Sequence, residues 1–365
     1  MKRILHTFFL VLLLLNSALH AFEKNSAQNK KVFLTGAAGF IGSNCLKYLF
    51  DKYPDYEFVV LDALTYAGNL ENIPAYIKES DRYQFIHGSV TDFAVVDEIM
   101  KSANFVVHFA AESHVTRSIL DDFIFFDTEV LGTRTLLVSL VKNSANVQRF
   151  IHISTSEVYG TAESEPMEET HPLNPRSPYA AAKAAADRLV YSYACTYDVP
   201  AVIVRPFNNY GPNQHLEKLI PHLLASAIRK EPLTIHGDGS QKRDWLHTQD
   251  TAMAIDKILH LPNFDTIKGE EINIGTGKSI SVLEIAHTIL DAFGLPPAQY
   301  LNFVSDRPGQ VDCHIAGIEK AKKLLNWEPT ISFEEGIQET IQWYKNNQMI
   351  WKKLEADEVV STHLN

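Results

Sequence analysis

From Lys31 onward, short apolar segments alternate with longer segments of helical period, and this alternation constrains the fold more than any other feature of the sequence. Each apolar segment is short enough for a buried strand and is followed by enough chain for a crossover helix. Strands joined in this way lie parallel, with helices on both faces of their sheet. The sequence therefore predicts an α/β fold with a doubly wound, Rossmann-type parallel sheet. The predicted strands are KVFLT, EFVVLD, YQFIHG, FVVHFA, RFIHIST and AVIVRP.

The pattern changes after Arg205, where loops rich in proline and glycine separate shorter helices and strands. We expect a sheet domain over residues 31–205 with a returning segment near 235–262. A smaller, interleaved C-terminal domain is expected mainly over 206–345, followed by a tail over 346–365. The loops that mark the change are RPFNNYGP, HGDGSQKRDW and SDRPGQ.

The N-terminal segment, residues 1–29, is set apart from the fold. Lys2 and Arg3 precede an apolar stretch, Phe8 to Leu15, and the sequence NSALHA follows. This arrangement resembles a secretory signal peptide and is short for a membrane span, although Leu19 is larger than a cleavage site prefers. Cleavage, an uncleaved anchor and an inert extension all stay open.

Charge and cysteine content exclude several classes of function. The 365-residue chain has a net charge of -11 spread along its length, which argues against a nucleic-acid or anionic-membrane surface. Cys45, Cys195 and Cys313 are far apart and form no CxxC pair, so we expect reduced core residues. The histidines lack metal-ligand spacing, and no metal is predicted.

A glycine-rich turn follows the first predicted strand. In TGAAGFIG, Gly36 lets the chain turn, Gly39 admits a pyrophosphate, and Gly42 lets helix and strand pack closely. Asp62 ends the second strand, where a carboxylate accepts the ribose hydroxyls of NAD and repels the extra phosphate of NADP. The cofactor expected here is NAD, and the GxxGxxG spacing resembles the short-chain dehydrogenase/reductase superfamily.

Two further segments carry candidate catalytic residues. In SPYAAAK, Tyr179 and Lys183 are four residues apart and share a helix face. Lys183 and a cationic nicotinamide ring would lower the pKa of the phenol, so that it can take a proton from a sugar hydroxyl. The strand RFIHIST delivers Thr155, Ser156 and Glu157 at its carboxyl end, where open α/β sheets bind ligands. Thr155 can bond the oxidised oxygen and Glu157 can reach the neighbouring carbon, whereas Ser156 can also be a simple turn residue.

These residues, together with LTYAGNLENI, HFAAESHVTRSI, RPFNNYGP, EKLIP, RDWLH and SDRPGQ, resemble the dTDP-glucose 4,6-dehydratases, an extended short-chain dehydrogenase/reductase family that acts on nucleotide sugars. The similarity runs from about Lys31 to about Lys345. It implies a homodimer formed through helices at Phe123 to Asn143 and Tyr179 to Tyr197, and a nucleotide-sugar substrate.

The resemblance also implies the site residues. Cofactor contacts would come from Phe40, Ile41, Asp62, Ala63, Leu64, Thr65, Ser89, Val90, Phe109, Ala110, Ala111, Ser113, Thr128, Tyr179, Lys183 and Asn209, beside the three glycines. Substrate contacts would come from Ser113, Thr155, Asn208, Glu217, Lys218, Leu219, Ile220, Pro221, His222, Arg243, Asn273, Asp306, Arg307, Pro308, Gly309 and Gln310. The basic members can hold a diphosphate on an otherwise acidic protein.

In this family the sugar is oxidised at C4, water is eliminated across C5 and C6, and the hydride returns to C6. Three positions depart from the family pattern: this sequence has Ser156, Thr116 and Ser89 where the family usually has aspartate. At Ser156 the aspartate would protonate the departing hydroxyl, and serine alone cannot. By analogy with GDP-mannose 4,6-dehydratases, Glu157 would remove the C5 proton and hand it to the C6 oxygen.

The sequence thus favours NAD-dependent dehydration of a nucleoside-diphosphate glucose, with dTDP-glucose preferred and a UDP sugar not excluded. UDP-glucuronate decarboxylase is the first alternative, because it shares the STSE sequence and needs no leaving-group acid. A nucleotide-sugar 4-epimerase and an NAD-binding regulatory protein without activity are the others. The substrate chemistry favours the cytoplasm, and a membrane is a partner only if residues 1–29 are an anchor.

Overall fold

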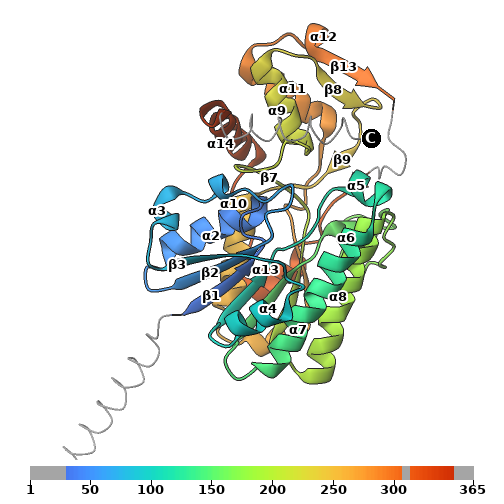
Figure 1. Cartoon of the computed structure of the whole chain (residues 1–365). Coiled ribbons are helices and arrows are strands. Elements are labelled where there is room, and N and C mark those ends of the chain that lie inside the picture. The colour runs from blue at the N-terminus through green and yellow to red at the C-terminus, as the bar shows by residue number, and fades with distance from the viewer. Residues whose placement is uncertain (1–29, 306–312, 349–365) are drawn as a thin grey trace, which may run out of the picture.

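The computed structural model describes residues 30–305 and 313–348 (Figure 1). Its centre is a seven-stranded sheet in the order β11-β6-β5-β4-β1-β2-β3, in which all neighbours are parallel. The predicted doubly wound sheet is confirmed, and each of the six predicted apolar segments forms a strand. The strands are β1 (Lys31–Thr35), β2 (Glu57–Asp62), β3 (Tyr83–His87), β4 (Phe105–His108), β5 (Arg149–Ile153), β6 (Ala201–Pro206) and β11 (Glu271–Ile274).

Helices cover both faces of this sheet (Figure 1). Side chains alternate between the faces, so Val32 and Leu34 of β1 pack into one core while Phe33 packs into the other. The first core is closed by α2 (Phe40–Lys52), α10 (Thr248–Leu259) and α13 (Glu319–Leu325), and the second by α4 (Phe93–Met100), α7 (Thr133–Lys142) and α8 (Pro178–Tyr197). Because the central strands are buried on both faces, they appear in the sequence as nearly continuous apolar runs.

The two long helices expected at residues 123–143 and 179–197 correspond to one interrupted and one regular helix. The first is α6 (Phe123–Phe125), a π-helical segment (Phe126–Gly132) and then α7. The second, α8, begins where Ser177 accepts the Ala180 N–H and Pro178 occupies the first helical position.

A smaller part of the chain lies beyond the carboxyl ends of the strands (Figure 1). Its apolar core includes Ile220, Trp245, Ile285 and Ile337. Its helices are α9 (Leu219–Arg229), α11 (Val282–Phe293), α12 (Pro297–Tyr300) and α14 (Phe333–Asn346). Its strands are β7 (Asn208–Tyr210), β8 (Leu233–His236), β9 (Lys242–Arg243), β10 (Trp245–His247), β12 (Ile280–Ser281), β13 (Leu301–Val304) and β14 (Cys313–His314).

The chain returns to the large sheet more than once. The expected return near 235–262 contains α10, which packs against α2, but the seventh strand, β11, comes from farther along the chain. Helix α13 then packs beside β11. The short elements near the sheet are α3 (Ala75–Lys78) and α5 (Val115–Leu120).

Two sequence-based expectations need comment. Of the three cysteines expected in the core, Cys45 is buried, Cys313 is only partly buried and Cys195 is exposed on α8, so the expectation is wrong for Cys195. Residues 1–29, which carry the signal-like segment, and most of the tail lie outside the described residues. No described helix has both the length and the apolar composition needed to cross a membrane.

Candidate active site

The glycine-rich turn joins β1 to α2 at the point where the sheet order reverses between β1 and β4. Gly36 has φ +70°, and a Cβ there would lie 2.5 Å from Ala110 N. A Cβ on Gly42 would lie 2.7 Å from Ala37 Cα, so helix and strand approach too closely for a side chain. A Cβ on Gly39 would lie 3.2 Å from Gly36 O, which is a looser contact. Gly39 also lines a cavity of about 440 Å³. This turn can therefore accept a pyrophosphate.

Asp62 ends β2 at the edge of the same cavity. Its two carboxylate oxygens accept the N–H groups of Ala38 and Leu64, each at 2.9 Å, and thereby fix the turn after β1 and the loop after β2. Burial raises the pKa of Asp62, while the two backbone donors oppose that shift. Each oxygen keeps a lone pair that can accept a ribose hydroxyl.

The candidate catalytic residues reach this cavity from two elements. Thr155 follows β5 and caps the short 3₁₀ turn Ser156–Tyr159 by accepting the Glu157 N–H at 3.2 Å. Tyr179 and Lys183 come from the first two turns of α8, and Lys183 Nζ donates to Ile153 O at 2.6 Å. Thr155, Glu157, Tyr179 and Lys183 all line the cavity, whereas Ser156 is 3% exposed and does not.

The environment of Tyr179 controls its acidity. Burial raises the pKa of Tyr179, and the charges of Glu129 and Glu157 raise it further, while the Thr155 side chain lowers it. Burial lowers the pKa of Lys183, and Glu129 and Asp187 oppose that shift. A cation bound beside the phenol would bring its pKa down toward the range in which it can act as a base.

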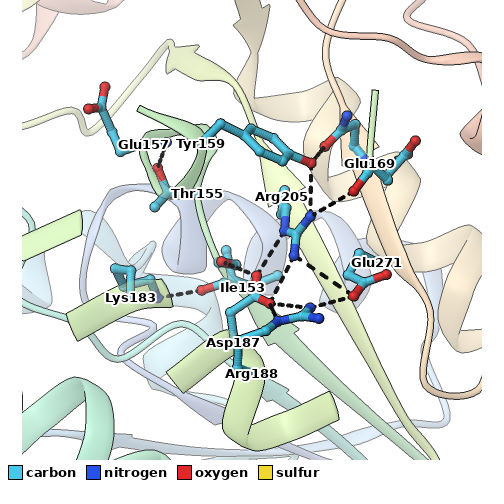
Figure 2. Close-up of polar contacts among 12 residues, drawn as sticks. Ile153, Thr155, Glu157, Tyr159, Glu169, Lys183, Asp187, Arg188, Arg205 and Glu271 are labelled. Carbon is cyan, nitrogen blue, oxygen red and sulfur yellow. Dashed lines mark hydrogen bonds and ion pairs between the residues drawn. The ribbon is translucent and has the colours of Figure 1, made fainter. Parts of the chain in front are cut away.

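A buried ion-pair network supports the turn that carries Glu157 (Figure 2). Arg205 on β6 donates to Asp187 of α8 at 2.9 and 3.0 Å, and Ser154 Oγ donates to the same carboxylate at 2.8 Å. Arg205 also donates to the Tyr159 hydroxyl at 3.0 Å. Although burial alone would raise it, the pKa of Asp187 lies below its usual value because of Arg205. The Glu157 carboxylate points away from this network (Figure 2), so the network fixes its backbone and leaves its side chain for chemistry.

One wall of the cavity is formed jointly by loops of the sheet domain and by the segment that precedes α9. Lys218 Nζ donates to Ser113 O at 2.8 Å and lies 3.3 Å from Glu217 Oε1, which also accepts the Tyr66 hydroxyl at 3.0 Å. Thr65 donates to Glu112 at 2.7 Å. These contacts join the loops after β2 and β4 to the segment before α9.

Most of the expected site residues meet in this one cavity. Those that line it are Gly36, Gly39, Phe40, Ile41, Gly42, Asp62, Ala63, Thr65, Ser89, Val90, Phe109, Ala110, Ala111, Ser113, Thr128, Thr155, Glu157, Tyr179, Lys183, Asn208, Asn209 and Lys218. They come from segments far apart in the sequence, and the strand ends bring them together.

Other expected contacts lie outside the cavity. The structure places Leu219–His222 in the first turn of α9 and Arg243 on β9, and Leu64 and Glu217 adjoin cavity-lining residues without lining the cavity themselves. The side chain of Asn273 is occupied by Tyr159 and Met167, which gives it a structural position and does not support a substrate contact. The loop Asp306–Gln310 lies outside the described residues.

The cavity wall also contains residues that the sequence did not single out as contacts. They are Leu61, Ala67, Gly68, Gly88, Val115, Ile153, Ser154, Pro206, Phe207, Asn213, Gln214 and His215. Most lie within one or two residues of a predicted contact, so motif position could have suggested them. Among the described residues, no cluster of histidine, cysteine, aspartate or glutamate is arranged to hold a metal.

A doubly wound sheet with this glycine turn, an acidic end to β2 and a Tyr–Lys pair beside a strand-end threonine defines a short-chain dehydrogenase/reductase with an added substrate-binding part. Residues 33–340 match the family model described as GDP-mannose 4,6 dehydratase. The chain belongs to this family, within the extended short-chain dehydrogenases/reductases.

Three similar proteins illustrate the breadth of the family. The low-salt glycan biosynthesis protein Agl12 of Haloferax volcanii is 43% identical over 86% of this chain and 98% of its own length. The Arabidopsis thaliana protein RHM1, a trifunctional enzyme with UDP-glucose 4,6-dehydratase activity, is 37% identical over 88% of this chain, which spans 48% of that protein. A structure of the dTDP-glucose 4,6-dehydratase DesIV from Streptomyces venezuelae with NAD bound has a TM-score of 0.83 at 38% identity, over 89% of this chain and 99% of that one.

Proposed function

We propose that this protein dehydrates dTDP-glucose to dTDP-4-dehydro-6-deoxy-glucose. Family membership places the chain among the NAD-dependent hydro-lyases that act on nucleotide sugars at C4 and C6. The observation that carries the proposal is the single cavity into which the glycine-rich turn, Tyr179, Thr155 and Glu157 all open. A dinucleotide bound along the turn would bring its nicotinamide end to these three side chains.

Each side chain then has a distinct step. NAD held along the glycine-rich turn would supply the acceptor for the C4 hydride of the sugar and the donor of the hydride that returns to C6. Tyr179 takes the proton of the C4 hydroxyl, and Thr155 donates a hydrogen bond to the same oxygen. The C4 ketone makes the C5 proton acidic, so that the Glu157 carboxylate can remove it. Since Ser156 does not line the cavity, we assign the proton given to the departing C6 hydroxyl to Glu157 as well.

The geometry favours dehydration over the decarboxylation of UDP-glucuronate. The decarboxylases share the STSE sequence, so Glu157 does not separate the two reactions, but a glucuronate carboxylate is best held by a cationic side chain. The described basic side chains that line the cavity are Lys183 and Lys218, and both already contact backbone oxygens. An epimerase would leave Glu157 without a step. The segments NNYGP and RDWLH, which favour the dTDP-glucose enzyme, form the adjacent strands β7 and β10.

The proposal is tested by the mass of the product. The purified full-length chain is incubated separately with dTDP-glucose, UDP-glucose and UDP-glucuronate. We expect dTDP-glucose to lose one water at the highest rate. Loss of carbon dioxide from UDP-glucuronate, with both glucose nucleotides unchanged, would assign the decarboxylase instead, and faster loss of water from UDP-glucose would reassign the nucleotide.

The Asp62 carboxylate should set the choice between NAD and NADP. Asp62→Asn keeps the shape and removes the charge that strengthens hydrogen bonds to the ribose. We expect NAD affinity to fall about 10- to 100-fold, because a hydrogen bond to a charged group is worth about 1.5–3 kcal/mol. Discrimination against NADP should also narrow. Titration of the cofactor-free protein with NAD and with NADP measures both affinities. Asp81→Asn, at an exposed residue, is the control.

We also propose that two copies pair through the helices at the outer edge of the sheet domain. Helices α5 and α6 and the π-helical segment pack on α8. The surface formed by these four elements exposes a group of apolar side chains. Such a group is unusual on a protein surface that faces only water. Its members are Ile119, Leu120, Phe123, Ile124, Phe126, Leu131, Tyr191 and Tyr197.

Charge placed in this apolar group should separate the copies. Leu120 is 76% exposed and Phe123 is 73% exposed, so replacing both with glutamate should leave the fold intact and yield monomers. Light scattering of the purified protein measures the mass. Phe303→Glu, at a residue 52% exposed on β13, is the matched control and should stay dimeric. A monomeric parent protein, or a dimeric double variant, would contradict the proposal.

A further inference from the structure

Glu129 is a buried acidic side chain that has no step in the proposed reaction. It is 1% exposed, and neither of its carboxylate oxygens has a normal hydrogen bond within the described part of the chain, although the backbone N–H groups of Glu112 and Glu129 lie near it. An ionised carboxylate without partners in such a place is costly, because burial removes its hydration. Ionisable groups with strongly perturbed pKa values cluster at functional sites, so Glu129 is a candidate for a role in the reaction.

The π-helical segment places Glu129 against the helix that carries Tyr179. Phe125 and Glu129 are four residues apart, and both are buried on the side that packs along α8. The Phe125 ring meets the Tyr179 ring edge to face, with centroids 6.3 Å apart, and Val130 packs into the same cluster. Thr128, the preceding residue, lines the cavity. The segment that buries Glu129 therefore packs on the helix that carries Tyr179 and Lys183.

Three ionisable groups face Glu129 from the elements around it. Tyr179 and Lys183 lie on α8, and Glu112 lies in the segment after β4. Burial raises the pKa of Glu129 well above its usual value; Lys183 opposes that shift and Glu112 adds to it. Burial and the charge of Lys183 lower the pKa of His108 to about 3 and that of His152 well below its usual value, so neither ring supplies a second cation.

Among the described residues, Lys183 is the cation that lowers the pKa of Glu129, and the proposed reaction gives the same ammonium to the Tyr179 phenolate. Within the chain itself, a single ammonium can balance one of the two anions. Two acids that share one counter-ion lose their protons in linked steps. A charge on Glu129 raises the pKa of Tyr179, and the reverse must hold equally.

We propose that Glu129 is a positioning residue that competes with Tyr179 for one proton, so that the Tyr179 phenolate forms less readily while the Glu129 carboxyl group is ionised. The inference rests on the proposed role of Tyr179 as the base. Its consequence is that Glu129 sets the lowest pH at which the sugar can be oxidised. An ionised Glu129 holds the phenol protonated, and a neutral side chain at this position releases it.

The test is an ultraviolet titration of the phenolate in the NAD-loaded protein without any sugar. The Tyr179 signal is isolated by subtracting the same titration of Tyr179→Phe in each background. In Glu129→Gln the Tyr179 midpoint should fall by about 1–3 pH units, the range expected when a nearby like charge is removed. The pH at which NADH formation from dTDP-glucose is half-maximal should fall with it.

Controls separate this role from a packing role. Asp127→Asn removes a charge from the same π-helical segment and should leave the midpoint unchanged, and Glu129→Asp should stay near the parent value. If Glu129→Gln does not fold, Glu129→Met provides a neutral side chain of similar length and should show the same fall. An unchanged midpoint in a folded Gln or Met variant would overturn the inference. Because this titration needs no sugar, failure of the dTDP-glucose assay alone would count against the proposed substrate and not against this inference.

Discussion

Replacing Glu157 with glutamine is expected to halt the reaction after sugar oxidation, with NADH accumulated and no water lost. Glutamine has nearly the same shape but cannot take the C5 proton or pass it to the C6 oxygen. Removing such an acid–base group typically lowers turnover about 10²- to 10⁴-fold. Absorbance follows NADH in a single turnover, and mass spectrometry of the same sample follows the sugar.

The control for Glu157 is Glu163→Gln, which changes an exposed carboxylate on the following loop that accepts a hydrogen bond from Asn174. It should turn over at the parent rate. Two results would contradict the assignment of the C5 and C6 proton transfers to Glu157: complete turnover by Glu157→Gln, or failure of this variant to form NADH at all. A protein that only binds NAD and a partner would show no difference between the variants.

Replacing Tyr179 with phenylalanine should block the reaction one step earlier. Without the phenol oxygen nothing takes the C4 hydroxyl proton, so hydride transfer to NAD cannot proceed. We expect NADH formation and turnover to fall together by about 10²- to 10⁴-fold, the usual contribution of a general base. The first turnover, measured by stopped-flow absorbance, distinguishes this loss from that of Glu157→Gln, in which NADH appears.

Tyr191→Phe is the matched control for Tyr179. Tyr191 lies on the same helix, α8, in the proposed dimer contact and outside the cavity wall, so its hydroxyl should not affect NADH formation. A rate of NADH formation in Tyr179→Phe close to that of the parent would show that another group acts as the base. Retained NAD binding in the variant confirms that the loss lies in chemistry.

The sheet was predictable because its information is local. Strands buried on both faces must be apolar along their whole length, so β1 to β6 stand out from the helices between them. The glycine turn was predictable for the same reason, since Gly36 and Gly42 occupy positions where the backbone leaves no room for a Cβ. Strand β11, only four residues long, was missed because its place beside β6 depends on the chain returning from the smaller part.

The site was predictable where short motifs carry it. Thr155, Glu157, Tyr179 and Lys183 were identified from two segments, and the structure brings them to one cavity. Ser156 was expected beside them, but it begins a 3₁₀ turn whose geometry buries it.

Glu129 could not be identified from sequence. Its burial depends on the π-helical segment and on how that segment packs against α8, and neither leaves a pattern in the residues. Exposed Cys195 shows the same dependence on packing, because only tertiary contacts decide which face of α8 is covered.

The central claim is that one cavity oxidises, dehydrates and reduces a single sugar with the same hydride. It is tested most directly with dTDP-glucose that carries deuterium at C4, followed by mass spectrometry and NMR of the product. The account predicts a product that has lost one water and carries the deuterium at C6. A dehydrated product without deuterium at C6, or recovery of dTDP-glucose unchanged under conditions where NAD is bound, would contradict it.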